Sequence, residues 1–313
     1  MALLTPARAA AAAPDGRAGP GPRVLLSARE DQLDSALALR RVAAHLGDLR
    51  RTGWSALEPP PVAALVCDDV AATERLLDLG VPVVHLRSGH CGPAADGAPP
   101  GRALGRVHRP GWLPSPGHPI PGARSTGVLA PRRTGLSRSR SGTLVMLSLW
   151  GVPDADAEAF AAGALRELAA AALHRTGSCT VVTDTGLGLL RSALAERPDV
   201  RVLRAADADP DALHADAAVF LASPVLGALA LAQARRAPLA LLPALGPAQR
   251  DLADQLGRVL PQLPLADDPD DPGLWAPPAG AAGPWHLLDP ALDDLRGAQR
   301  VARVLRQLAL APL

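Results

Sequence analysis

The chain has 313 residues, which is enough for two ordinary domains that each bury a hydrophobic core. Its formal net charge of +1 excludes a strongly basic or acidic surface, so the composition indicates no nucleic acid partner. Three cysteines without a paired spacing exclude a zinc cluster or a disulfide framework. We therefore expect reduced thiols, no metal and a cytoplasmic protein.

Residues 1–22 are rich in alanine, proline and glycine, and arginine interrupts their apolar run. This composition predicts a disordered leader rather than a secretory signal. No stretch of about eighteen uncharged apolar residues follows, so we expect no membrane span.

Short apolar runs alternate with helix-like segments over residues 23–130, which predicts an α/β domain with a parallel sheet. The expected strands are 23–27, 61–67 and 81–86, and the expected helices are 31–46 and 71–79. The periodicity fails from 88 to 140, apart from a candidate edge strand at 126–130. Residues 131–141 are expected to link this domain to a second one.

A second alternating series predicts another α/β domain over residues 142–290. The expected strands are 142–149, 179–184, 200–203, 217–221 and 239–242, and the expected helices are 156–174, 187–194, 227–235 and one that starts near 249. Residues 211–214 are expected to form a turn. The C-terminal segment 291–313 is expected to hold a helix over 292–308 that folds back across the domain boundary.

Residues 223–227, Ser-Pro-Val-Leu-Gly, follow a buried strand and open a helix. Unpaired backbone N–H groups, such as those of Leu226 and Gly227, favour an anion at such a corner. Gly227 lets a ligand approach the backbone closely, and Ser223 offers a hydroxyl, whereas Pro224 has no N–H. The segment predicts a site for a nucleoside diphosphate, and the alternative is an ordinary strand-to-helix corner.

This corner is followed by its helix, by the sequence APLALLP and by a helix headed by Gln249. The succession resembles the donor half of GT-B glycosyltransferases over residues 143–306. The segment ASPVLGALALAQARRAP is similar to cytosylglucuronic acid (CGA) synthase-related proteins. The resemblance implies two Rossmann-like α/β domains facing a cleft, the first of them short and loop-rich. It also implies a uridine diphosphate sugar as co-substrate, a small acceptor, and no other cofactor.

The same resemblance assigns roles to individual residues. Gln249 matches a residue that contacts sugar hydroxyls, with Asp251 as its helper, and the alternative is a helix-capping glutamine. Gly151 lies where relatives have glycines beside the donor. Arg204 lies where relatives hold the base, with a surface arginine as the alternative. Many relatives have a ribose-binding glutamate at the position of Ala230, so this chain lacks that contact.

The N-terminal half is expected to supply the acceptor site and the catalytic base. His85 and His90 flank the carboxyl end of a strand, an edge that faces the cleft in open α/β folds. The alternatives are a core-facing His85 and an exposed His90. Asp31 is a further candidate base, with helix capping as its alternative.

Two other functions are consistent with these residues. A degenerate relative would bind a nucleotide or a partner protein without catalysis, since the Gly-rich loop of the family is missing after the first strand. A nucleotide-sugar epimerase of the same fold would need several carboxylates near the anomeric carbon. For the diphosphate site, a Gly227→Asp change is expected to abolish binding of uridine diphosphate and to leave the fold intact.

Overall fold

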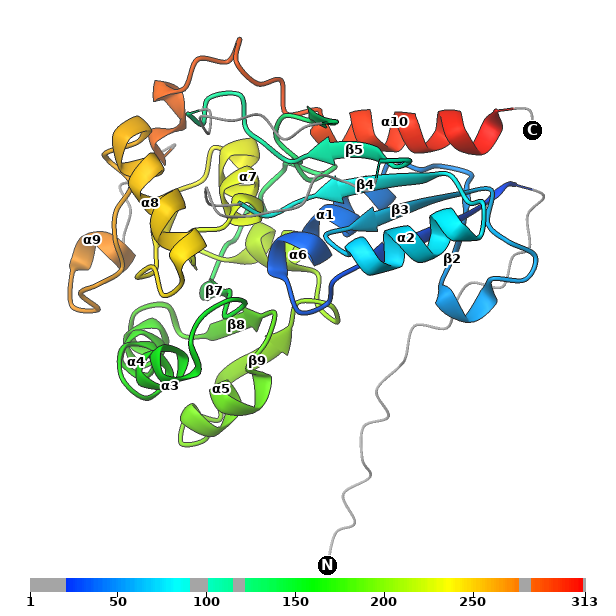
Figure 1. Cartoon of the computed structure of the whole chain (residues 1–313). Helices are drawn as coiled ribbons and strands as arrows, with labels where there is room; N and C mark the ends of the chain where they lie inside the picture. Colours follow the sequence, from blue (N-terminus) through cyan, green and yellow to red (C-terminus); the bar gives the residue numbers. More distant parts are fainter. Residues whose placement is uncertain (1–20, 91–100, 115–121, 276–282, 312–313) are drawn as a thin grey trace, which may run out of the picture.

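The computed structural model of the chain describes residues 21–90, 101–114, 122–275 and 283–311. Within these residues the chain forms two parallel β-sheets, each with helices on both faces (Figure 1). The expected α/β architecture of two Rossmann-like domains is therefore confirmed. No helix in these ranges is long and apolar enough to cross a membrane.

The N-terminal domain has a six-stranded sheet. Its elements are β1 (Arg23–Ala28), α1 (Leu33–Ala43), β2 (Arg50–Thr52), η1 (Trp54–Ala56), β3 (Ala63–Cys67), α2 (Val70–Asp78), β4 (Val83–Arg87), β5 (Leu104–Val107) and β6 (Ala123–Ser125). The strand order is β2-β1-β3-β4-β5-β6, and all neighbouring pairs are parallel. The expectation of a short, loop-rich domain is not supported, because β5 and β6 extend the sheet where the sequence shows no periodicity.

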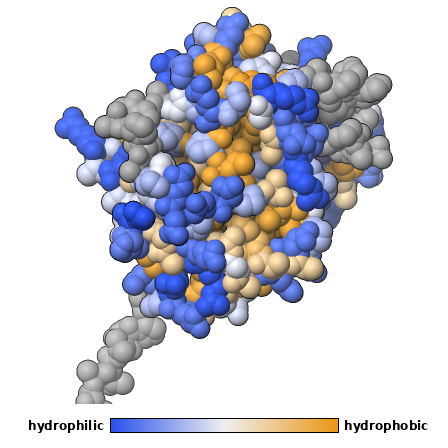
Figure 2. Space-filling model, turned by 90° about the vertical axis from the view of Figure 1, so that its left-hand side faces the viewer, coloured by the Kyte–Doolittle hydropathy of each residue, from blue (hydrophilic) through white to orange (hydrophobic). Residues whose placement is uncertain are grey.

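The C-terminal domain has a five-stranded sheet in the order β11-β10-β7-β8-β9, also parallel throughout. Its elements are β7 (Thr143–Leu147), α3 (Asp154–Ala162), α4 (Ala164–Thr176), β8 (Cys179–Thr183), α5 (Leu187–Ala193), β9 (Val200–Arg204), α6 (Pro210–Asp216), β10 (Val219–Ala222), α7 (Leu226–Arg235), β11 (Ala240–Leu241), α8 (Pro247–Val259), α9 (Pro272–Trp275) and η2 (Gly283–Leu287). The strands are short apolar runs, as expected when helices cover both faces of a sheet. On the side of the molecule where α8 and α9 lie, apolar residues gather in the middle of the face, with hydrophilic residues around them (Figure 2).

The last helix, α10 (Gly297–Leu310), crosses back to the N-terminal sheet (Figure 1). Its buried residues recur at every third or fourth position, as an amphipathic helix requires: Ala298, Val301, Ala302, Leu305 and Ala309. They pack in one cluster with Val24, Val42 and Leu65 of the N-terminal domain. The C-terminal segment thus completes the core of the first domain.

Two elements of the C-terminal domain differ from those expected. A capping hydrogen bond accounts for one difference, and a glycine lies at the other. Residues 211–214 belong to helix α6 instead of a turn, since Asp209 caps that helix by accepting a hydrogen bond from the Ala212 N–H. The single helix expected over 156–174 is divided into α3 and α4 at Gly163.

The expected edge strand at 126–130 is wrong. The edge strand β6 ends at Ser125, and Gly127, with a φ of +74°, turns the chain away from the sheet. Val128 and Ala130 are instead buried beside α7. This segment therefore contributes to the contact between the domains.

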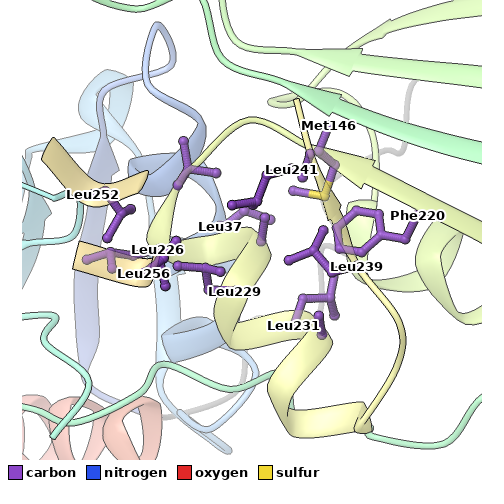
Figure 3. Close-up of a cluster of buried hydrophobic side chains, with 14 of the residues drawn as sticks. Leu37, Met146, Phe220, Leu226, Leu229, Leu231, Leu239, Leu241, Leu252 and Leu256 are labelled. Carbon is purple, nitrogen blue, oxygen red and sulfur yellow. The ribbon is translucent and has the colours of Figure 1, made fainter. Parts of the chain in front are cut away.

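Helix α1 carries the main contact between the two domains. Leu37 follows the adjacent residues Leu33 and Asp34 by four and three positions, and Arg41 follows Leu37 by four, so they share one face of the helix. Both leucines are about 1% exposed and belong to the hydrophobic core of the C-terminal domain. Figure 3 shows Leu37 among leucines of α7 and α8. The apolar core is thus continuous from one domain into the other.

Arg41 secures the same contact through its polar bonds. Its buried guanidinium donates through Nε (3.2 Å) and Nη2 (2.7 Å) to the two carboxylate oxygens of Asp211 on α6. Its Nη1 donates to the carbonyl groups of Leu129 and Gly227, at 3.0 Å each. One side chain of the N-terminal domain therefore donates to four acceptor oxygens on three residues at the boundary.

We expect Arg41→Met to lower the free energy of unfolding by about 3–5 kcal/mol, because Asp211 loses its cation in a buried place. Arg102→Met is the matched control, since the pair of Arg102 and Asp78 is exposed and contributes little. Urea denaturation of both variants measures the difference. Equal losses in the two variants would show that Arg41 does not secure the boundary.

Candidate functional site

The strand β10 ends in the corner that was predicted to bind an anion. Ser223 is fully buried there, and its Oγ accepts a hydrogen bond from the Ser148 N–H at 3.1 Å. The Ser223 N–H donates to the carbonyl of Met146 at 2.8 Å. These hydrogen bonds hold the corner against the end of β7. The Ser223 hydroxyl oxygen therefore already has a partner within the domain.

A carboxylate of the N-terminal domain occupies this corner. Asp34 of α1 accepts hydrogen bonds from the N–H groups of Gly227 (2.6 Å) and Leu226 (3.3 Å) at the start of α7. The first N–H groups of a helix and the helix dipole stabilise a negative charge. The corner thus holds an oxyanion, and here that oxyanion is a side chain of the same chain.

Burial raises the pKa of the Asp34 carboxyl to about 7. The hydrogen bonds from Gly227 and Leu226 oppose this rise, and the nearby charge of Asp68 adds to it. Asp34 therefore titrates near neutral pH, unlike an exposed aspartate.

Close approach of α1 explains why residue 227 is a glycine. A Cβ atom at this position would lie 2.5 Å from Cδ1 of Leu37 and 2.8 Å from Oδ1 of Asp34. A side chain at residue 227 would have to displace the ends of Leu37 and Asp34, which argues against the expectation that Gly227→Asp leaves the fold intact. Ala230, one turn further along, is buried against Val128 and Ala130.

Gln249 connects α8 to the end of β7. Its buried carboxamide accepts a hydrogen bond from the Leu245 N–H (3.0 Å) and donates one to the carbonyl of Ser148 (2.9 Å). A carboxamide has two donor hydrogens and two acceptor lone pairs, so each end keeps one further position for a hydrogen bond.

His90 and Asp251 meet across the domain boundary. His90 Nε2 lies 2.5 Å from Oδ2 of Asp251 on α8, and Gln255 donates to the same oxygen at 3.0 Å. The sequence singled out both residues, one as a base and one as a donor-side helper, without predicting that they pair. The Asp251 carboxylate thus holds the His90 ring in place.

A cavity lies between the domains beside these groups. Asp34, His90, Ser148, Trp150 and Gln249 are among the residues that line it. Its free volume is about 50 Å³. Small-molecule sites usually enclose roughly 300–1,000 Å³, so this cavity has room for a few water molecules and not for a nucleotide sugar.

Two of the predicted bases lie elsewhere. His85 is buried with its Nδ1 2.8 Å from Oγ1 of Thr73 on α2, and burial lowers its pKa to about 4. Asp31 pairs with Arg29 at 2.6 Å, and this hydrogen bond lowers the pKa of Asp31. Neither residue lines the cavity.

The remaining residues that were predicted to bind the sugar donor lie near the boundary between the two domains. Arg204, at the end of β9, forms an ion pair of 3.2 Å with Glu30 of the N-terminal domain. Gly151 has a φ of +69° just after β7, a left-handed conformation that favours glycine. The Trp150 ring beside it has the Arg29 guanidinium 5.8 Å from its centroid.

Three buried carboxylates near the facing edges of the two sheets were not among the predicted site residues. Besides Asp34, Asp184 accepts bonds from the Ser148 hydroxyl (2.6 Å) and the Leu33 N–H (3.1 Å). Asp68, with a φ of +59°, accepts from the N–H and the hydroxyl of Ser88. Burial raises the pKa of both Asp68 and Asp184.

These carboxylates differ in the signal that the sequence gives for them. Asp68 and Asp184 directly follow the buried strands β3 and β8, a position at which polar residues face a ligand edge in open sheets. Asp34 lies in the first turn of a helix, where an acidic residue has an ordinary local explanation. Within the described ranges, no group of three or more His, Cys, Asp or Glu residues comes together to hold a metal ion.

The sequence model of a family described as CGA synthase-related protein matches residues 24–313. The chain belongs to this family. No curated protein matches its sequence.

Two solved structures show which fold this CGA synthase-related protein has. Spinosyn rhamnosyltransferase complexed with thymidine diphosphate has a TM-score of 0.52 and 14% identity, over 92% of this chain and 99% of that chain. The calicheamicin glycosyltransferase CalG4 has a TM-score of 0.50 and 15% identity, over 94% of this chain and 100% of that chain. The fold is that of the GT-B glycosyltransferases.

We expect Gly227→Ala to destabilise this member of the family by about 1–3 kcal/mol, because the new methyl group meets Leu37 and Asp34. Gly188→Ala in helix α5 is the control, since a Cβ there meets nothing within 4 Å. Alanine is the better helix former, so the control variant is expected to be unchanged or slightly more stable. Thermal denaturation compares the two, and a neutral Gly227→Ala would contradict the close approach of α1.

Folding raises the pKa of Asp34 from 3.8 to about 7, so the folded state binds its proton more tightly. Asp34 therefore stabilises the fold fully below pH 3.8, and this stabilisation is lost as pH rises to about 7. In the Asp34→Asn variant, the carboxamide at this position does not titrate. We expect its free energy of unfolding, relative to the natural chain, to rise across this interval by up to about 4 kcal/mol, at about 1.4 kcal/mol per pKa unit.

Urea denaturation at about pH 4 and at about pH 8, which span this interval, measures the change. A difference that stays constant between the two conditions would show that Asp34 does not change protonation on folding in this range.

Proposed function

We propose that this protein transfers a sugar from a nucleoside diphosphate, expected to be uridine diphosphate, to a small acceptor. The observation that carries this proposal is the convergence of the Leu226 and Gly227 N–H groups on one oxyanion, the Asp34 carboxylate. Fixed backbone donors at such a place stabilise the negative charge that develops on a leaving diphosphate. The thymidine diphosphate bound to spinosyn rhamnosyltransferase supports this class of ligand.

The donor sugar would lie next to the diphosphate, towards Gln249 and Ser148, which line the cavity. The further donor and acceptor positions of Gln249 suit the vicinal hydroxyl groups of a sugar. Arg204 and Gly151 remain our proposed contacts to the nucleotide. A cytoplasmic location, and a need for no cofactor besides the sugar donor, also remain predictions.

His90 is the residue that we propose as the general base. When the Asp251 carboxylate accepts a hydrogen bond from Nε2, Nδ1 carries the lone pair that takes a proton. In the transfer, the bond between the anomeric carbon and the diphosphate oxygen breaks with its electron pair leaving on the diphosphate. The acceptor oxygen bonds to the anomeric carbon, and its proton passes to His90.

We expect His90→Gln to lower kcat by about 10²–10⁴-fold without weakening the binding of uridine diphosphate. His286→Gln, which changes an exposed histidine of η2, is the control and should keep full turnover. Release of uridine diphosphate from a panel of its sugars, each with a set of small acceptors, measures turnover. Equal turnover in the two variants would exclude His90 as the base, and no turnover by the natural chain would contradict the transferase proposal.

The second candidate function is that of a non-catalytic relative that binds a nucleotide or a partner protein. Two observations favour it: the cavity of about 50 Å³ and the carboxylate that already occupies the corner. Binding of uridine diphosphate without turnover or hydrolysis of any of its sugars would select this candidate.

A further inference from the structure

We propose that Asp34 is an internal competitor of the diphosphate, so that binding at the corner requires the two domains to separate along α1. The inference rests on the proposed function, because it concerns the regulation of the same site. Its experiment is nevertheless independent of any sugar transfer.

The first step is that the two anions exclude each other. The Gly227 and Leu226 N–H groups already donate to Asp34, and each N–H has a single hydrogen to give. Leu37 covers the same place, with Cδ1 2.5 Å from where a Cβ of Gly227 would lie. A phosphate group therefore reaches these amides only after Asp34 and Leu37 have left.

The second step is that Asp34 cannot leave alone. Its short side chain is buried, and Oδ2 lies 3.5 Å from the Cβ position of Gly89. Leu33, on the same helix face, donates its N–H to Asp184 and is buried in the core of the other domain. Release of the carboxylate thus moves α1 as a whole away from α7.

The third step is energetic. The affinity for a ligand falls in proportion to the fraction of molecules in which its site is open. Every contact that closes the boundary therefore lowers the affinity for a diphosphate, but Asp34 alone also occupies the amides themselves. Its removal both vacates the site and removes a negative charge from beside the ligand.

The experiment measures binding of inorganic pyrophosphate to the full chain by titration calorimetry. Asp34→Ala vacates the amides, and Asp34→Asn keeps one acceptor oxygen without the charge. We expect affinity to increase at least about tenfold in Asp34→Ala, since a hydrogen bond to a charged group contributes about 1.5–3 kcal/mol. Asp34→Asn still offers one acceptor oxygen to the amides, so its affinity should be lower than that of Asp34→Ala.

Glu30→Gln is the matched control. This variant also removes a carboxylate that bonds across the domain boundary. The carboxylate of Glu30 pairs with Arg204 at the end of β9, whereas that of Asp34 bonds to the start of α7. We expect the affinity of Glu30→Gln for pyrophosphate to change far less than that of Asp34→Ala, because this exposed ion pair contributes little to closing the boundary. An increase as large as that of Asp34→Ala would overturn the inference, because general loosening of the boundary would then explain both variants.

Hydrogen exchange of the Leu226 and Gly227 amides provides a second readout. These amides should lose protection in Asp34→Ala and regain it when pyrophosphate is added. Pyrophosphate affinity that is no higher in either Asp34 variant than in the natural chain overturns the inference, even if the natural chain transfers sugars. Conversely, a tenfold gain without any sugar transfer supports the inference and contradicts the transferase proposal.

Discussion

The hydrogen bonds from the first N–H groups of α7 to the Asp34 carboxylate determine how the two domains of this protein meet. They bring α1 so close to α7 that a Cβ atom at residue 227 would lie 2.5 Å from Cδ1 of Leu37 and 2.8 Å from Oδ1 of Asp34. Leu37 then packs into the second domain, and Arg41 reaches the Gly227 carbonyl and Asp211 from the same helix face. The apolar core consequently continues across the boundary from one domain into the other.

The physical property that makes such a corner suitable for a diphosphate also makes it suitable for a carboxylate. Unpaired N–H groups at a helix N-terminus stabilise any oxyanion that reaches them. A ligand and a neighbouring domain therefore compete for the same donors. In this chain the small residues Gly227 and Ala230 favour the neighbouring domain, because they allow α1 and residues 128–130 to pack against α7.

Polar groups gather where the carboxyl ends of the strands from both sheets face each other. Asp68 and Asp184 follow β3 and β8, while His90 and Asp251 pair across the boundary. Their placement follows from the parallel topology, which sends the ends of all strands in one sheet to one edge. A GT-B fold thus collects groups suited to acid–base chemistry at the boundary, even though the described cavity there is small.

The sequence by itself determined the alternation of strands and helices, the corner at 223–227 and the resemblance to GT-B enzymes, because these depend on local periodicity and on residue types at short spacing. It did not determine the edge strand, the burial of His85 or the pairing of His90 with Asp251. Only the tertiary structure placed Asp34, whose partners lie 192 and 193 positions further along the chain. Local sequence patterns indicate that the corner at 223–227 can bind an oxyanion. The packing of the first domain on the second decides that this oxyanion is the Asp34 carboxylate.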